Sequence, residues 1–91
     1  MAKIDLEQIK EKLRGKKIDV EFISKNYTFF QIDSCILDED DLDFTLHSLK
    51  QDSYISIPTE YINDIRQIYD EVGEMYRIYC DDGKLDLLII G

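Results

Sequence analysis

The spacing of the apolar residues changes near Lys17, and this change constrains the fold more than any other feature of the sequence. Before that point, apolar residues recur at three- and four-residue intervals, which is the period of an amphipathic helix. Asp5 and Gln8 have the spacing of a capping box, and Gly15 can adopt the left-handed conformation that ends a helix. The sequence therefore predicts a first helix over about residues 5–14.

From residue 18 onward, apolar residues alternate with polar ones, which is the period of a strand with one solvent-exposed face. Short polar segments separate four stretches of this kind, and such segments are typical of turns between antiparallel strands. We therefore expect a four-stranded antiparallel meander. Its predicted strands cover residues 18–22, 27–37, 42–47 and 54–57.

The pattern changes again over residues 59–72, where six apolar or aromatic residues fall on one helical face. Thr59 is a plausible helix cap and Gly73 a plausible stop, so we expect a second helix here. The rest of the chain, residues 75–90, predicts a β-hairpin around an Asp-Gly turn. Its last part, residues 85–90, is almost entirely apolar, which favours a central strand that is covered on both faces.

These elements predict an α+β fold in one domain, residues 1–91, because a chain of this length can build only one core. The expected order is an N-terminal helix, the four-stranded antiparallel meander, the second helix and the C-terminal β-hairpin. The alternative is a Sm-like small β-barrel with an inserted helix. A helix that leads into about five short, curled strands resembles those barrels, although they have only a tight turn where the second helix is expected.

The charge of the chain restricts its partners. Its 20 acidic and 11 basic residues give a net charge of −9, and residues 18–91 hold 17 of the acids but only five of the bases. Such a surface repels nucleic-acid phosphates and anionic membranes, so we expect no direct nucleic-acid or membrane binding. A basic protein partner is favoured for the same reason.

Two acidic clusters are the candidate contact sites. They fall at two expected hairpin turns, and their spacing does not match that of a calcium-binding loop. One interpretation is that they keep the turns soluble, and the other is that they bind basic side chains, since paired carboxylates suit arginine. The candidate residues are Asp38, Glu39, Asp40, Asp41 and Asp43 in the first cluster, and Asp81 and Asp82 in the second.

Tyr76 is a further candidate contact residue. The chain has six tyrosines, and tyrosine is enriched at protein interfaces because it offers a large area and a hydroxyl group. Tyr76 and Tyr79 are expected on opposite faces of one strand, so one of them should be exposed. The alternative is that these rings pack in the core or at its edge.

No arrangement of residues in the sequence predicts catalysis, a metal site or a cofactor. His47 is the only histidine, and the four glycines stand singly, so no phosphate-binding loop is present. Cys35 is expected on the polar face of the strand next to His47, but a nucleophile also needs a pocket and oxyanion donors. We therefore expect a protein that is not an enzyme.

Cysteine usage and hydropathy favour a cytoplasmic protein. Cys35 and Cys80 lie in apolar segments without the spacing of a redox pair, which is typical of buried reduced thiols. The N-terminus lacks the pattern of a signal peptide. The longest apolar run, residues 87–90, is far shorter than the ~20 residues of a membrane span.

In its size, its acidity and its acid-rich segment 36–43, the chain resembles the small acidic inhibitors encoded by phages and mobile elements, including anti-CRISPR and anti-restriction proteins. The resemblance implies a nucleic-acid-handling enzyme as target, whose basic nucleic-acid-binding surface the inhibitor occupies. One alternative is a self-assembling structural or Sm-like module that forms a homodimer or ring through strand edges. Another is an immunity protein against a basic toxin.

Overall fold

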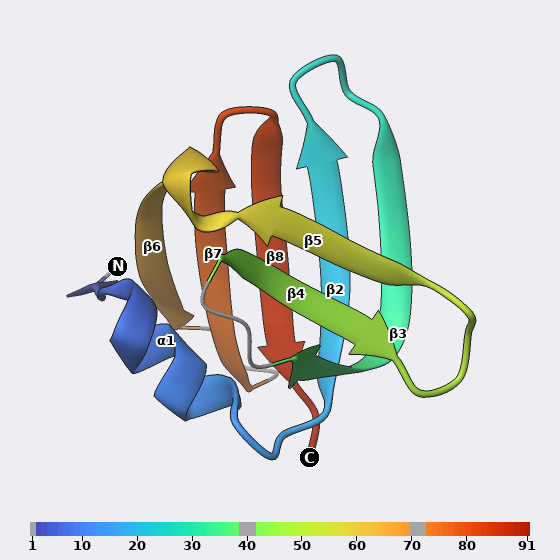
Figure 1. Ribbon diagram of the computed structural model, residues 1–91. Helices are drawn as coiled ribbons and strands as arrows, with labels where there is room; N and C mark the ends of the chain where they lie inside the picture. The colour runs from blue at the N-terminus through green and yellow to red at the C-terminus, as the bar shows by residue number, and fades with distance from the viewer. Residues whose placement is uncertain (1, 39–41, 70–72) are drawn as a thin grey trace.

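The computed structural model of the chain describes residues 2–38, 42–69 and 73–91 (Figure 1). In chain order the elements are β1 (Ala2–Lys3), α1 (Leu6–Leu13), β2 (Ile18–Ser24), β3 (Phe29–Asp38), β4 (Asp43–Ser48), β5 (Tyr54–Pro58), the 3₁₀ turn η1 (Thr59–Tyr61), β6 (Ile62–Tyr69), β7 (Glu74–Cys80) and β8 (Gly83–Ile89). The strands form one antiparallel sheet in the order β1-β6-β7-β8-β2-β3-β4-β5. Strands β1 and β5 are therefore the two edges of this sheet.

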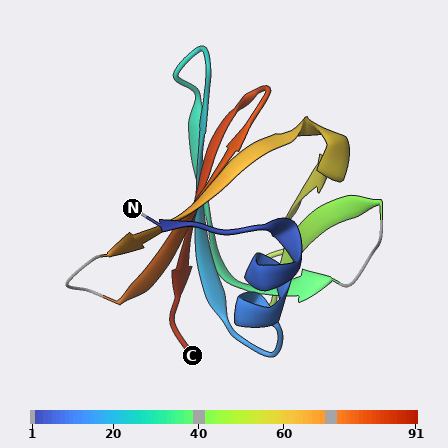
Figure 2. The ribbon, with the colours of Figure 1, turned by 90° about the vertical axis from the view of Figure 1, so that its left-hand side faces the viewer.

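The first helix is confirmed, and so is its capping box. The Gln8 backbone N–H donates to Asp5 Oδ1 at 2.8 Å, and the Asp5 N–H donates to Gln8 Oε1 at 2.9 Å. Gly15 follows the helix with a φ of +74°, the left-handed conformation expected of it. Ile9 and Leu13 are fully buried in the core, and α1 lies on the concave side of the sheet, where it contacts β3 (Figure 2).

Strand β3 bends the sheet because it pairs with different neighbours along its length. Its first part pairs with β2, whereas residues Cys35 to Asp38 pair with β4. At the bend, Ser34 has a φ of 54°, and its backbone N–H donates to Asp19 Oδ1 at 3.0 Å. As a result, β4 and β5 cross in front of β8 and β2 (Figure 1), and the core fills the space between these two layers.

The prediction of a second helix is wrong. Residues 59–61 form the single turn η1 and residues 62–69 form strand β6, which pairs with β7 along its length, while residues 70–72 lie outside the described part of the chain. β-Branched residues favour a strand, and Ile62, Ile65 and Ile68 supply three of them here. The pairing with β6 also covers the edge of β7, whose backbone N–H and C=O groups would otherwise be left without partners.

The predicted fold class therefore needs correction. The chain is not a four-stranded meander with two helices but an eight-stranded sheet with one α-helix in the part that the structure describes. The Sm-like alternative with an inserted helix is wrong at the same place, because η1 is a single turn. Strands β7 and β8 also lie between β6 and β2, within the sheet rather than beside it.

The C-terminal hairpin is confirmed, with β8 in a central position between β7 and β2. Its expected coverage on both faces is wrong. Leu85 and Leu87 are fully buried, whereas Asp86 and Leu88, on the opposite face, are only half-buried. This alternation is typical of an antiparallel sheet with one face toward solvent. Within the described residues, no helix has the length and apolar character needed to cross a membrane.

Candidate protein-binding surface

The turn η1 joins the two hairpin turns that carry the candidate acidic residues. On one side, the Thr59 backbone N–H donates to Leu42 O at 3.1 Å, directly before β4. On the other side, the Asp81 N–H donates to Tyr61 O at 3.1 Å in the β7–β8 turn. Two turns that are about 40 residues apart in the sequence are therefore held on either side of one three-residue turn.

This arrangement places acidic residues from three segments around η1. Asp43 begins β4, Glu60 lies in η1, and Asp81 and Asp82 form the β7–β8 turn; Glu60, Asp81 and Asp82 are exposed and Asp43 is half-buried. We call these four residues the acidic corner.

Hydrogen bonds from neighbouring segments hold the β7–β8 turn in place. Asn63 Nδ2 donates to Asp81 Oδ1 at 3.0 Å, and the Lys25 backbone N–H donates to Asp82 O at 2.9 Å. The Asp82 contact uses its backbone carbonyl and leaves its carboxylate available to a partner. Ordered backbone around exposed carboxylates lowers the entropy lost on binding.

An apolar pocket of about 280 Å³ adjoins the acidic corner. Its walls include Phe22 and Phe30, whose ring centroids are 5.3 Å apart, together with Ile55 and Tyr61. Among the described residues that line this pocket, Asp82 is the only charged one. We call this hollow the apolar pocket.

A second hollow, of about 370 Å³, lies on the other side of Pro58. Pro58 lines both hollows, and the second one is also lined by Asp43, Thr59 and Glu60. No lysine or arginine is among the described residues that line either hollow. The surface around Pro58 therefore combines an apolar cavity with carboxylates, a combination that suits a partner with both apolar and basic side chains.

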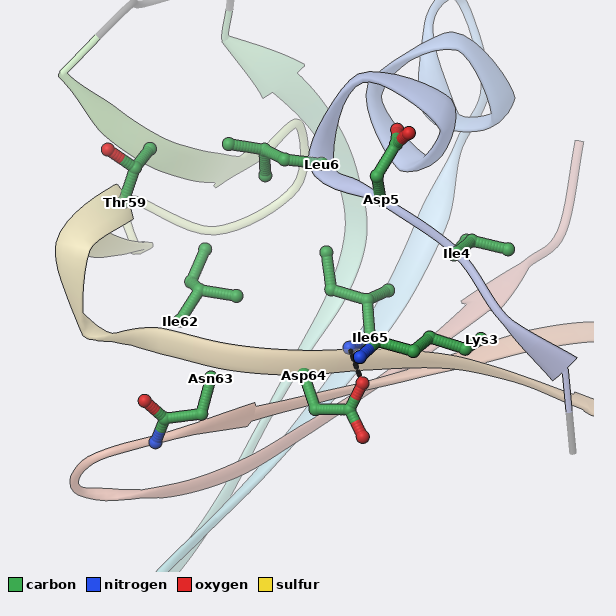
Figure 3. Close-up of a pocket in the computed structure, with 9 residues that line it drawn as sticks. All are labelled: Lys3, Ile4, Asp5, Leu6, Thr59, Ile62, Asn63, Asp64 and Ile65. Atoms are coloured by element: carbon green, nitrogen blue, oxygen red, sulfur yellow. Dashed lines mark hydrogen bonds between the residues drawn. The ribbon is translucent and has the colours of Figure 1, made fainter.

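A third hollow, of about 230 Å³, lies between β6 and the start of α1 (Figure 3). Its carboxylates already serve the fold. Asp5 caps α1, and Asp64 accepts hydrogen bonds from the Ile65 N–H at 3.0 Å and from Arg66 Nε at 2.8 Å. The Arg66 contact lowers the pKa of Asp64. We therefore place the binding surface at the acidic corner and not here.

The structure places the other predicted contact residues differently. Tyr76 is fully buried on the inward face of β7, and its hydroxyl hydrogen-bonds Glu74, so it cannot contact a partner. Asp38 is half-buried at the end of β3 and lies 2.6 Å from His47 Nδ1 through its Oδ2 atom. Glu39, Asp40 and Asp41 lie outside the described residues.

Glu60 and the apolar pocket were not found from the sequence. Glu60 lies within the expected second helix, and no local pattern relates it to the two acidic turns. The pocket combines residues from four segments that the sequence gives no means of bringing together. The Pro58-Thr59 step was the available indication, since proline often marks the end of a strand at a sheet edge.

The cysteines are buried and unreactive in character. The expectation that Cys35 lies on a polar face is wrong, because the bend at Ser34 shifts the following residues and Cys35 is fully buried. Burial, with Asp19 and Asp33 nearby, raises the pKa of the Cys35 thiol to about 11. Burial also raises the pKa of Cys80. Neither thiol has the lowered pKa of a catalytic nucleophile.

Comparisons with known proteins give no further guide to function: no family model matches the chain, and neither a curated protein nor a solved structure does. Within residues 2–38, 42–69 and 73–91, no three histidine, cysteine or acidic side chains are grouped so that they could hold a metal ion. The function proposed below therefore depends on the geometry of the acidic corner and the apolar pocket.

Proposed function

We propose that the protein is a non-catalytic binding module that inhibits a nucleic-acid-handling enzyme by occupying its basic nucleic-acid-binding surface. The observation that carries this proposal is the joining of two acidic turns by η1, through the Thr59–Leu42 and Asp81–Tyr61 hydrogen bonds. Carboxylates held on a fixed backbone can take the place of phosphates in a basic groove, where arginine binds either group through two hydrogen bonds.

The net charge of −9 supports the same proposal through association kinetics. Opposite charges on two partners steer their encounter and raise the association rate, and this effect weakens as salt increases. The apolar pocket supplies the other part of an interface, because a buried anchor at the centre of a contact contributes more binding energy than the charges at its rim.

The experiment is affinity capture from a bacterial lysate at about 0.1 M and about 0.5 M salt, where the Debye length falls from ~10 Å to ~4 Å. The bait is the 91-residue chain, and bound protein is eluted with duplex DNA or with RNA. We expect capture of a nucleic-acid-binding enzyme that is weakened at high salt and displaced by its own nucleic acid.

A neutralised variant tests whether the acidic corner is responsible. Its four substitutions are Asp43→Asn, Glu60→Gln, Asp81→Asn and Asp82→Asn, and Asn-Gly retains the preference of the β7–β8 segment for a tight turn. A matched control removes four acids elsewhere, through Glu7→Gln, Glu11→Gln, Glu21→Gln and Asp52→Asn. Loss of capture in the first variant and retention in the second is the expected result.

Three outcomes would contradict the proposal. Resistance of the captured protein to displacement by nucleic acid at every concentration would be incompatible with a shared site. Equal loss of capture in both variants would show that only total charge matters. Capture of nothing except further copies of the chain would support the self-assembling module instead.

A further inference from the structure

Strand β5 ends the sheet and leaves one edge open. Among the described residues it pairs only with β4, in an antiparallel register that places Tyr54 opposite His47. Directly before β5, the Ser48 N–H donates to Ser53 O at 2.9 Å, so this opposed pair is hydrogen-bonded. Bonded and non-bonded pairs alternate along an antiparallel ladder. Tyr54 and Ser56 therefore direct their N–H and C=O groups toward the open edge.

The opposite edge of the sheet is protected, whereas β5 is not. Strand β1 pairs with Arg66 and Gln67 of β6, and the Ile4 N–H donates to Ile65 O at 3.0 Å. β6 also carries an ion pair between Asp64 and Arg66. Charges and covering segments are the usual protection of an edge strand, and residues 54–58 contain no charge.

The apolar pocket lies along this open edge. Ile55 and Ile57, the inward residues of β5, line it. Ser56 lines it as well, although its hydroxyl hydrogen-bonds Thr45 at 2.8 Å on the outer face of the sheet. The pocket therefore reaches the backbone of β5 at its edge. Its volume of about 280 Å³ exceeds the ~150 Å³ of a cavity that binds benzene, so one large side chain fits.

Charge determines which strand can occupy the edge. Among the residues that the structure describes, the charged ones that line the apolar pocket and the hollow beyond Pro58 are Asp43, Glu60 and Asp82, all acidic. We propose that β5 binds an extended segment of the target protein as an added strand, with a large apolar side chain in the apolar pocket and adjacent lysine or arginine on the acidic corner. This inference rests on the proposed function, because it names how the target is held.

A second copy of the chain fits the same edge less well. Each copy carries a net charge of −9, so two copies repel one another. Strand β5 of a second copy, residues 54–58, contains no basic residue, and Lys50, which precedes it, is accompanied by the acidic Asp52. The one basic residue of β6, Arg66, is already paired with Asp64 of its own strand.

The test uses two synthetic peptides as probes. One is Thr-Ile-Thr-Phe-Thr-Lys-Arg, and the other carries the Lys-Arg pair at its N-terminus, because an added strand can run in either direction. Each is titrated into the 91-residue chain while backbone amide NMR shifts and heats of binding are recorded. We expect one peptide to bind, with the largest shifts at Tyr54 to Ile57 and at Tyr61.

Ser56→Pro is the decisive variant. It removes the N–H that Ser56 directs toward the open edge, and proline is tolerated in an edge strand where no ladder bond is lost. We expect the fold to persist and the peptide to bind about tenfold more weakly, as loss of one or two hydrogen bonds implies. Ser56→Ala is the matched control: it removes the same hydroxyl but keeps the N–H, so it should bind like the wild type.

Other results would overturn strand addition. These are equal binding by the wild type and Ser56→Pro, tighter binding of a peptide with Glu-Glu in place of Lys-Arg, or no binding of either peptide at millimolar concentration. A dimer in sedimentation that Ser56→Pro dissociates would assign the edge to a second copy.

Failure of this inference is distinguishable from failure of the proposed function. If Ser56→Pro still captures the enzyme and the neutralised variant does not, the acidic corner docks the target without strand addition. If peptide binding requires the Ser56 N–H but the neutralised variant captures the enzyme as well as the wild type does, the edge binds a strand and the proposed function is wrong.

Discussion

Arg77 and Asp86 face each other on β7 and β8 and form two hydrogen bonds, from Nε to Oδ1 at 2.7 Å and from Nη2 to Oδ2 at 3.0 Å. The Asp86 carboxylate raises the pKa of Arg77, and both side chains are less than one-third exposed. On its other side, Asp86 lies opposite Glu21 of β2. Arg77 therefore neutralises the charge of Asp86, which would otherwise stand unpaired opposite the like charge of Glu21.

Arg77→Met should destabilise the protein, because it leaves Asp86 half-buried beside Glu21 without its partner. We expect a loss of about 1–3 kcal/mol in the free energy of unfolding, measured by urea denaturation. Arg77→Met combined with Asp86→Leu should recover most of this loss, since two apolar groups replace the whole ion pair. A double variant no more stable than the single one would contradict this account.

Gly83→Ala should be among the most destabilising single-methyl additions in the chain. Gly83 has a φ of +156°, and an added Cβ would meet the Ile23 carbonyl oxygen and lie 2.8 Å from Ser24 Cα. We expect a cost of about 2–4 kcal/mol, because neither backbone contact can move without breaking the β2–β8 pairing. Gly73→Ala is the control: its nearest contact is an ordinary 3.7 Å, and its melting temperature should change little.

Asp64 should contribute to acid sensitivity. Its pKa is lowered in the folded state, first by the hydrogen bond from Arg66, so its contribution is present above the unfolded pKa of about 3.9 and is lost as pH falls through the folded value. Asp64→Asn should therefore flatten the decline of the melting temperature between about pH 5 and pH 2. Asp52→Asn, in the exposed β4–β5 turn, should keep the wild-type slope.

Cys35 should resist thiol reagents in the folded protein. Its pKa of about 11 leaves little thiolate at pH 8, and its side chain is fully buried, whereas Cys80 is 7% exposed. We expect Cys80 to react before Cys35 and both to react at one rate in urea. Because the folded pKa of Cys35 is raised, its contribution to stability is present below the unfolded pKa of 9.0 and is lost as pH rises through about 11. Cys35→Ala should remove that alkaline loss.

Where local chemistry determined the structure, the sequence was sufficient to predict it. The capping box of Asp5 and Gln8, the end of α1 shortly before Gly15 and the Asp-Gly hairpin all depend on residues a few positions apart. Their hydrogen bonds and backbone conformations occur wherever such residues stand at those spacings.

The prediction of a second helix failed because the apolar residues in 59–72 recur with a helical period, although the strand with which this segment pairs lies later in the sequence. Ile65 is 3% exposed and fits either element, so the pairing of β6 with β7 decides between them. That pairing is a tertiary interaction that overrides the local pattern. The prediction that Cys35 lies on a polar face failed for a related reason. One residue at a bend reverses the alternation of buried and exposed residues that follows it, and nothing in the sequence marks Ser34 as that residue.

The candidate site was predictable only in its charges. Asp43, Asp81 and Asp82 could be selected because they cluster at turns, but their joining through η1 depends on a turn that replaces the expected helix. The open edge of β5 could not be derived either, since strand order in a sheet follows from the whole topology and not from the strand's own residues.

The open edge of β5 also gives the acidity of this chain a colloidal role. At neutral pH the net charge of −9 keeps copies apart, although Tyr54 and Ser56 present free backbone groups beside an apolar cavity. Those backbone groups do not titrate, whereas the repulsion disappears as the pH approaches the isoelectric point near 4.4. In that range we expect copies to pair through this edge, so that the turbidity of the solution rises with protein concentration.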